Sequence, residues 1–182
     1  MIDEGADIID IGGESTRPGA AAITEIEEAE RVVPVIRALR EAGISIPISV
    51  DTYHASVAQQ AIEAGASIVN DVSAGEDDPK MIPYLAANGI PAILMHKRGN
   101  AITMDKQAVY SDVTAEVAQY CVDRSFVALQ AGLPRWCTMI DPGLGFAKNT
   151  EQNCTLVREI PRFRAITKEM PLLVDMNDSV EE

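Results

Sequence analysis

The sequence has few aromatic residues, an excess of acidic over basic residues, and no long hydrophobic run. Aromatic side chains make up 4% of its 182 residues, and 15 Lys and Arg residues against 28 Asp and Glu residues give a net charge of −13. Nucleic-acid binding needs a basic surface, so we do not expect nucleic acid as a partner. The longest apolar stretches, such as residues 90–95, are far shorter than the roughly 20 residues that cross a bilayer, which excludes a membrane-spanning helix.

Cysteine is scarce, and the start of the sequence lacks basic residues. Cys121, Cys137 and Cys154 form an odd set whose spacing fits neither a disulfide framework nor a CxxC metal site. Asp3 and Glu4 stand where a secretory signal peptide carries positive charge. We therefore expect a soluble, cytoplasmic protein with reduced thiols. Its 47% hydrophobic residues suffice for one domain over residues 1–182.

A repeated pattern of glycine followed by a short apolar run predicts parallel strands. A glycine after a helix supplies the left-handed C′ residue, and runs that are apolar throughout suit strands buried on both faces. A sixth run, residues 171–174, follows a polar segment, so we predict six strands in total. The five runs that follow a glycine are residues 7–11, 46–50, 67–69, 91–95 and 137–140.

The segments between these runs predict helices, several with clear start signals. Thr24 and Glu27 fit a capping box, in which each side chain accepts a hydrogen bond from the other residue's backbone N–H. Pro34 falls inside the same segment, and we expect it to kink or break the helix. Asp78 is predicted to be the N-cap of a later helix, and a longer helix is predicted over residues 112–131.

Alternating strands and helices predict an α/β fold with a parallel sheet, either an open doubly wound sheet or a (β/α)8 barrel. The barrel is favoured because polar residues end run after run, and a barrel gathers such residues at one mouth. A complete barrel has eight strands in about 250 residues, so six predicted strands indicate an incomplete one. The strand-end residues are Asp10, Asp51, Asn70, Asp71, His96, Asp141 and Asp175.

Several of these residues could form one acceptor-rich pocket. Asp51, Asn70 and Asp141 together suit a flat heterocycle with amino and ring N–H donors, although each alone also fits a helix cap or a turn. The glycine-rich loop at residues 12–19 carries Arg17, whose guanidinium could neutralise a phosphate group at the edge of the pocket. Lys97 and Arg98 are weaker candidates for that role, and His54 is predicted to be a surface residue.

Five motifs in order resemble the dihydropteroate synthase family. They are IDIGGESTRPG, SVDT, ASIVNDVS, ILMHKRG and IDPGLGFAKN, and the resemblance runs from about residue 5 to residue 148. It implies a (β/α)8 barrel that condenses 6-hydroxymethyl-7,8-dihydropterin pyrophosphate with p-aminobenzoate, forming 7,8-dihydropteroate and pyrophosphate in folate biosynthesis. The family is a sulfonamide target.

The resemblance also implies roles for individual residues. The residues that contact the pterin are Asp51, Asn70 and Asp141, with Val72 and Met95 as apolar walls. The catalytic loop residues Thr16 and Arg17, together with Pro18, match the loop that closes over p-aminobenzoate and pyrophosphate, and Phe146 matches the aromatic residue beside the p-aminobenzoate site.

The sequence departs from the family pattern at both ends. The family's N-terminal strand carries an asparagine that helps to hold Mg²⁺, and no residue of this sequence matches it, so the resemblance assigns no metal ligand here. After residue 174 the family's pterin-binding Lys and its eighth strand are also unmatched. We therefore expect a truncated chain, such as a splice, frameshift or gene-model product, with impaired activity alone. The resemblance matches residues 171–174 to the family's seventh strand, and part of the family's homodimer interface lies beyond that strand. We therefore expect the homodimer to be weakened.

Two other functions stay open. A pterin-dependent methyltransferase of the same superfamily would share the Asp and Asn pocket, although GESTRPG with its Arg17 fits a pyrophosphate substrate better. A non-catalytic pterin-binding fragment is the alternative from outside enzyme chemistry. Turnover with p-aminobenzoate would distinguish both from a synthase.

Overall fold

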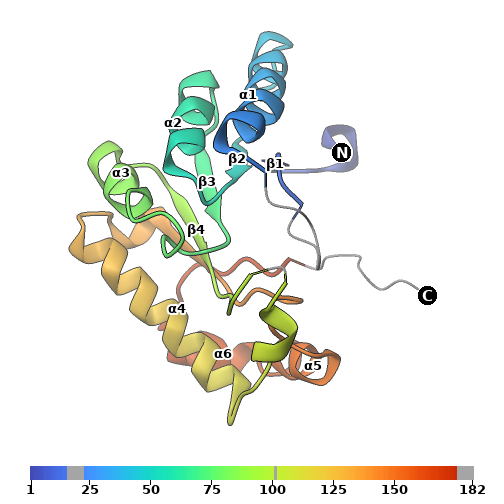
Figure 1. The fold of residues 1–182 in the computed structure, drawn as a ribbon, viewed down its shortest axis with the longest axis vertical. Coiled ribbons are helices and arrows are strands. Elements are labelled where there is room, and N and C mark those ends of the chain that lie inside the picture. The colour runs from blue at the N-terminus through green and yellow to red at the C-terminus, as the bar shows by residue number, and fades with distance from the viewer. Residues whose placement is uncertain (16–22, 101, 176–182) are drawn as a thin grey trace.

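One parallel sheet runs through the protein, and helices flank one side of it in chain order (Figure 1). The computed structural model describes residues 1–15, 23–100 and 102–175. The sheet order is sequential from the first strand to the fifth, whereas a doubly wound sheet reverses its order at a switch point. The predicted α/β fold with barrel-type strand order is thus confirmed. The strands are β1 (Ile9–Gly12), β2 (Ile48–Asp51), β3 (Ile68–Asp71), β4 (Ala92–Met95) and β5 (Thr138–Asp141).

Each connection between neighbouring strands contains a helix, as parallel pairing requires. The helices are α1 (Glu25–Glu41), α2 (Ala55–Ala64), α3 (Met81–Asn88), α4 (Val113–Gln130), α5 (Thr150–Arg158) and α6 (Ile160–Ile166). Three short 3₁₀ helices, Ile2–Glu4, Met104–Gln107 and Arg135–Cys137, complete the regular structure of the described residues. None of the helices in the described part of the chain combines the length and the hydrophobicity that crossing a membrane requires.

The predicted sixth strand is reduced to a single bridge. Leu172 forms an isolated parallel bridge with Ile140 of β5, through hydrogen bonds from Ile140 N to Pro171 O and from Leu173 N to Ile140 O, both 2.9 Å long. Pro171 has no N–H to donate, so the segment cannot extend the ladder toward its amino end. Six strands were expected from the sequence, and the described residues contain five strands and this bridge.

Local helix signals are confirmed where the partners are close in sequence. Thr24 Oγ1 accepts from Glu27 N at 3.2 Å, and the Glu27 carboxylate accepts from Thr24 N at 3.0 Å, which is the predicted capping box. Asp112 caps α4 by accepting from Ala115 N at 3.0 Å. These reciprocal bonds satisfy backbone donors that a helix start otherwise leaves unpaired.

Of the two outcomes expected at Pro34, a kink or a break, the break is wrong. Helix α1 continues through Pro34, which is exposed to solvent. A proline inside a helix costs about 3 kcal/mol, and the burial of several apolar side chains at about 1.5–3 kcal/mol each exceeds that cost. Ala29, Val32 and Ile36 are all buried on the face of α1 that packs against the sheet.

The expected N-cap role of Asp78 is also corrected. Helix α3 begins at Met81 with Lys80 as its N-cap, so the helix starts later than the sequence predicted. The Asp78 carboxylate instead accepts from Lys80 N and from Ala55 N, the first residue of α2, both at 2.9 Å. Asp78 thus serves the start of a neighbouring helix, a contact that local sequence patterns cannot reveal.

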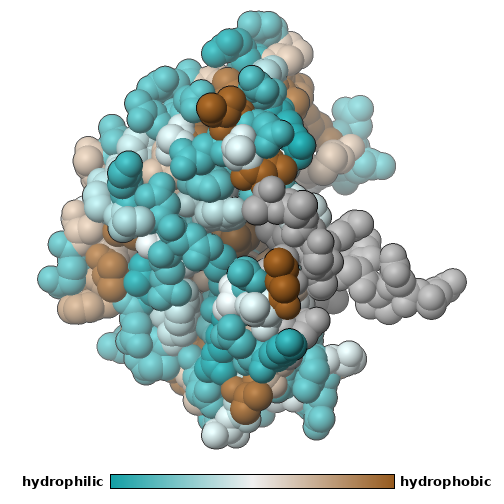
Figure 2. Space-filling view, in the orientation of Figure 1, coloured by the Kyte–Doolittle hydropathy of each residue, from teal (hydrophilic) through white to brown (hydrophobic). Residues whose placement is uncertain are grey.

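The apolar core has two parts, one on each half of the sheet. The first lies between the sheet and helices α1 to α3, and the second lies among α4, α5, α6 and β5. Phe163 of α6 is 1% exposed and belongs to the second part. Figure 2 shows that the outer face of the protein in this view is mainly hydrophilic, with hydrophobic residues scattered across it.

We predict that Phe163→Ala destabilises the protein by about 3–5 kcal/mol, because it leaves a cavity in the second core. The matched control is Phe126→Ala on α4, where the side chain is 57% exposed and its loss should cost less than about 1 kcal/mol. Urea denaturation followed by circular dichroism measures both values. Equal destabilisation by the two variants would contradict the assignment of the second core.

Candidate ligand site at the carboxyl ends of the strands

The carboxyl ends of the strands meet at one polar pocket. In the sheet ladder Asp51 pairs with Asn70, and Met95 pairs with Asp141. Because parallel strands end at the same edge, their final side chains reach a common space. The pocket has a volume of about 230 Å³, and it is lined by Asp10, Glu14, Ser15, Asp51, Asn70, Val72, Met95, Asp141, Phe146 and Asp175.

The pocket contains every predicted site residue that the structure describes. These residues are Asp51, Asn70, Val72, Met95, Asp141 and Phe146. The remaining three, Thr16, Arg17 and Pro18, lie outside the described residues and follow Glu14 and Ser15, which line the pocket. The sequence had marked Asp10 and Asp175 only as strand-end residues, and the structure adds Glu14 and Ser15 to them.

A hydrogen bond to Asp10 of β1, on the far side of β2 in the sheet, orients the Asn70 side chain. Asn70 Nδ2 donates to Asp10 at 3.2 Å, and the hydroxyl of Ser49 donates to the other carboxylate oxygen of Asp10. The nitrogen end of the amide is thus directed toward β1. Its carbonyl oxygen is then available to accept a hydrogen bond from a ligand in the pocket.

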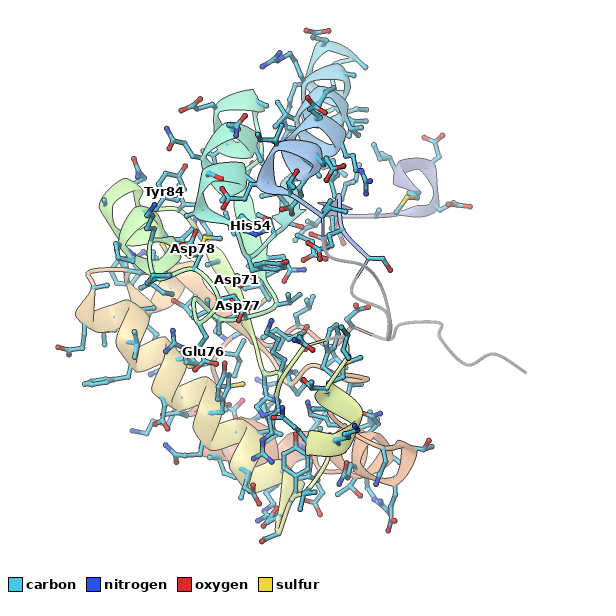
Figure 3. The ribbon with its side chains drawn as sticks, viewed as in Figure 1. His54, Asp71, Glu76, Asp77, Asp78 and Tyr84 are labelled. Carbon is cyan, nitrogen blue, oxygen red and sulfur yellow. The ribbon has the colours of Figure 1, made fainter. Side chains whose placement is uncertain are left out.

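Asp71 points away from the pocket, although it directly follows Asn70. Its carboxylate is buried and accepts from Ser73 N at 2.8 Å and from Gly75 N at 2.6 Å. Figure 3 shows Asp71 at the start of the acidic β3–α3 connection. Side chains alternate between the two faces of a strand, so Asn70 serves the pocket and Asp71 shapes the following turn.

The two central carboxyl groups differ in their ionisation. Burial raises the pKa of Asp51 to about 8, and the negative charges of Asp10 and Glu28 add to that effect. Burial also raises the pKa of Asp141, but only to about 6, because a hydrogen bond from Gly143 N at 2.7 Å opposes it. At pH 7 the pocket therefore holds a protonated Asp51, which can donate, and an ionised Asp141, which accepts.

The loop between β5 and α5 is held tightly against the end of β4. Gly143 has φ of +65°, and a Cβ atom there would lie 2.1 Å from the carbonyl oxygen of His96. Only glycine fits this position, since both the backbone angle and the close approach exclude a side chain. The loop carries Asp141 at its start and Phe146 near its end, so its shape sets the separation of two pocket walls.

The interior of this loop contains a buried lysine that sequence reasoning missed. Lys148 is 8% exposed, and its ammonium group contacts two carbonyl oxygens of the loop and one ring nitrogen of His96. The sequence feature that could have identified it is its place in the motif IDPGLGFAKN. A lysine after a turn is usually exposed, so its burial was not expected. Its partners lie up to 52 residues away in sequence.

The expectation that His54 is a surface residue is wrong. His54 is the N-cap of α2 and is half-buried, with Nδ1 2.7 Å from the Oε2 atom of the buried Glu28 on α1 (Figure 3). The starts of the two helices lie side by side, which brings these residues together. Glu14 completes a group whose ligand atoms lie within 4.8 Å of one another, and Tyr53 donates to Glu14 at 2.9 Å.

Lys97 and Arg98, the weaker candidates for binding a phosphate, are held by acidic partners and do not line the pocket. Lys97 forms an ion pair with Asp77. Arg98 Nη2 lies 2.9 Å from Glu116 Oε2, and its guanidinium stacks at 4.0 Å from the ring centre of Tyr110. These contacts direct both side chains toward α4 and the β3–α3 connection.

A second, larger cavity of about 470 Å³ lies beside the polar pocket and shares Asp10, Asn70 and Asp175 with it. Most of its lining is apolar and comes from the inner face of the sheet and from residues 171–174, including Ile68 and Met139. Neither Asp51 nor Asp141 lines it. The polar pocket is therefore the better candidate for a specific ligand.

Comparison with known proteins identifies relatives of one kind. The dihydropteroate synthase of Synechocystis sp. is 45% identical over 174 residues, which are 96% of this chain and 59% of that protein. The solved structure of Xanthomonas albilineans dihydropteroate synthase with 4-aminobenzoic acid is 41% identical with a TM-score of 0.87, and the match covers 96% of this chain and 60% of that chain. The Yersinia pestis dihydropteroate synthase with a sulfonamide drug complex is 36% identical, with a TM-score of 0.90 and coverages of 96% and 62%.

The chain thus spans about 60% of the length of these relatives. A family model described as pterin binding enzyme matches residues 1–177. The sequence match, the structural match and the strand order all agree with the barrel of the dihydropteroate synthase structures. The chain belongs to the pterin binding enzyme family.

Proposed function

We propose that the protein acts as a dihydropteroate synthase in folate biosynthesis, with the polar pocket as its pterin site. In this reaction p-aminobenzoate attacks the methylene carbon of 6-hydroxymethyl-7,8-dihydropterin pyrophosphate, and pyrophosphate leaves. The observation that carries the proposal is the convergence of Asp51, Asn70 and Asp141 in one small pocket between apolar walls.

The chemistry of the pocket suits a flat heterocycle with both donors and acceptors. The ionised Asp141 accepts from amino or ring N–H groups, the protonated Asp51 donates to a ring nitrogen or oxygen, and Asn70 offers its carbonyl oxygen. Val72 and Met95 are buried and supply apolar surface for the ring. A volume of about 230 Å³ matches a compact ligand, since larger drug-sized ligands occupy pockets of about 300–1,000 Å³.

The second substrate would lie beside Phe146. The X. albilineans relative, 41% identical, is solved with 4-aminobenzoic acid, which supports an arylamine site in this family. Phe146 lines the pocket and can pack against the flat face of such a ring. Bringing the amine and the pterin methylene together in this way accelerates the reaction by positioning.

The charge of the pocket supports a role for Arg17. Five acidic residues line it, and within the described residues no Lys or Arg does. A departing pyrophosphate needs positive charge. Arg17 lies two residues after Ser15, which lines the pocket. We propose that Arg17 stabilises the leaving group, with Thr16 and Pro18 closing over the substrates, so that catalysis is electrostatic rather than nucleophilic.

The resemblance to the family also implies Mg²⁺. Among the described residues, Glu14, Glu28 and His54 form the group of possible ligands that lie within reach of one another. Mg²⁺ prefers oxygen ligands in octahedral geometry, whereas this group offers an imidazole nitrogen that is already hydrogen-bonded to Glu28. The group does not fit Mg²⁺, and no step proposed here uses a metal ion.

A second function, pterin binding without turnover, is favoured by one observation. The described lining of the pocket contains no basic residue that could stabilise pyrophosphate. A pocket of this kind would bind a pterin through its carboxyl and amide groups and leave the bond to pyrophosphate intact. Binding and turnover therefore have to be measured separately.

Three further features stay proposals. We propose a cytoplasmic location, a single domain over residues 1–182, and a weakened form of the homodimer that the resemblance implies. The three cysteines, Cys121, Cys137 and Cys154, are free thiols, which supports a reducing compartment.

We predict that the protein binds pteroic acid and incorporates radiolabelled p-aminobenzoate into dihydropteroate. Arg17→Ala should lower turnover by about 10²–10³-fold, because one preorganised positive group at the leaving group is lost. The control Arg37→Ala changes an exposed arginine on α1 and should leave turnover unchanged. Binding without turnover would support the second function, and the absence of both would contradict the two proposals.

We predict that Asp141→Asn weakens binding of pteroic acid roughly tenfold or more at pH 7, because a charged acceptor is lost. Asp51→Asn should weaken binding less, since the side chain that it replaces is already uncharged at this pH. Calorimetry measures both affinities, with Asp123→Asn on the exposed surface of α4 as the matched control. Unchanged affinity in both pocket variants would show that the ligand binds elsewhere.

The affinity for pteroic acid should also pass through a maximum between about pH 6 and pH 8. Asp141 gains a proton as pH falls through about 6 and stops accepting, whereas Asp51 loses its proton as pH rises through about 8 and stops donating. Calorimetry from pH 5 to pH 9 tests this. Asp141→Asn should remove the acidic limb and Asp51→Asn the alkaline limb, while any limb that arises from the ligand persists in both variants.

A further inference from the structure

Lys148 is buried without a carboxylate as a hydrogen-bonding partner. Its Nζ atom lies 2.8 Å from the carbonyl oxygens of Gly143 and Phe146 and 2.9 Å from Nδ1 of His96. The burial of a charged group is costly unless something compensates for it, and here the compensation comes from neutral acceptors. Burial accordingly lowers the pKa of Lys148 to about 7. An exposed lysine would avoid this cost, so we looked for a function that requires Lys148 to be buried.

The three contacts connect parts of the pocket wall. Gly143 and Phe146 lie on opposite sides of the turn in the β5–α5 loop, and His96 directly follows β4. Lys148 therefore connects both ends of the turn to His96, the residue that follows β4. A further hydrogen bond from Tyr110 to Ala147 O, at 3.0 Å, ties the same loop to the segment before α4.

Both influences that lower the pKa of Asp141 depend on Lys148. The larger one is the hydrogen bond from Gly143 N, and Lys148 holds Gly143 in place through its carbonyl oxygen. The other is the positive charge of Lys148 itself. Burial and the charge of Asp175 act in the opposite direction and would keep Asp141 protonated. Removal of Lys148 would thus abolish the second of these influences and loosen the support of the first, although Phe146 N also donates to the Gly143 carbonyl oxygen at 3.1 Å.

The hydrogen bonds of Lys148 can persist when its charge changes. An ammonium group has three N–H donors, which match its three acceptors, and burial keeps His96 neutral by lowering its pKa to about 2. A neutral amine has two N–H donors and one lone pair, which could accept from Nδ1–H in the other tautomer of His96. The titratable groups that face Lys148 are Asp141, Arg98 and Cys121, and burial keeps the Cys121 thiol neutral at pH 7 by raising its pKa to about 12.

We propose that Lys148 is a positioning residue of the pocket, which fixes the β5–α5 loop and keeps Asp141 an anionic hydrogen-bond acceptor. The proposal rests on the proposed pterin site for its meaning in function. The effect of Lys148 on the ionisation of Asp141 can be measured without any ligand.

The test compares Lys148→Met, which removes the charge but keeps the length of the side chain, with Lys80→Met at an exposed position. Carbon-13 NMR of the Asp141 carboxyl group follows its titration in the free protein. The midpoint should rise by about one unit in Lys148→Met and stay unchanged in Lys80→Met. An unchanged midpoint in a folded Lys148→Met protein would overturn the proposal.

Ligand binding provides the second measurement. At pH 7 Lys148→Met should bind pteroic acid about twofold more weakly than the unchanged protein, because a midpoint near 7 leaves about half of Asp141 ionised. The ratio of the two affinities, each measured at the same pH, should approach one at pH 8, where Asp141 ionises in both proteins. A purely structural role would give a loss that pH does not recover. If the Asp141 midpoint shifts but neither protein binds pteroic acid, the proposed function fails and the role of Lys148 stands.

The unchanged protein provides a test if Lys148→Met does not fold. Nitrogen-15 NMR locates the titration of the Lys148 amine, and the carbon signal of Asp141 should show a second inflection at the same pH. A Lys148→Arg protein, which keeps the positive charge, should retain the Asp141 midpoint more closely than Lys148→Met does. The absence of the second inflection in the unchanged protein would overturn the proposal.

Discussion

In-register pairing of parallel strands is the constraint on which the pocket depends. Each strand is four residues long, and the ladder sets Asp51 beside Asn70 and Met95 beside Asp141. A shift of one residue in any strand would turn its last side chain to the other face of the sheet. The apolar residues of the strands fix this register because they must face the helices. Core packing and site geometry thus have the same origin, and the polar residues take positions that the core has already determined.

The electrostatics of the pocket follow from placing carboxyl groups where water is scarce. Several acidic groups in one small space cannot all ionise at pH 7, so they separate into donors and acceptors. Asp51, surrounded by other carboxylates, keeps its proton, while Asp141 has backbone and lysine partners that favour its charge. Two residues of the same type thereby acquire different functions, and the difference comes from neighbours contributed by distant parts of the chain.

The sequence predicted features whose causes are local and missed those that arise across the fold. The capping box at Thr24 and the strand-end position of Asp141 follow from a few adjacent residues. The continuity of α1 through Pro34 depends on burial against the sheet, and the contact of His54 with Glu28 joins residues 26 positions apart. Lys148 is the clearest case, because its place in the motif IDPGLGFAKN predicts neither its burial nor its contact with His96, 52 residues away.

The bond between Asn70 and Asp10 links the centre of the sheet to its margin. Asp10 belongs to β1, which within the described residues pairs only with β2. Asn70 belongs to β3, on the other side of β2. Fraying of the marginal strand would therefore release the amide that faces the pocket. By thermodynamic reciprocity, a ligand that immobilises Asn70 also protects β1 from fraying. Slower amide exchange along the whole of β1 would then report occupancy of a pocket that this strand lines only through Asp10.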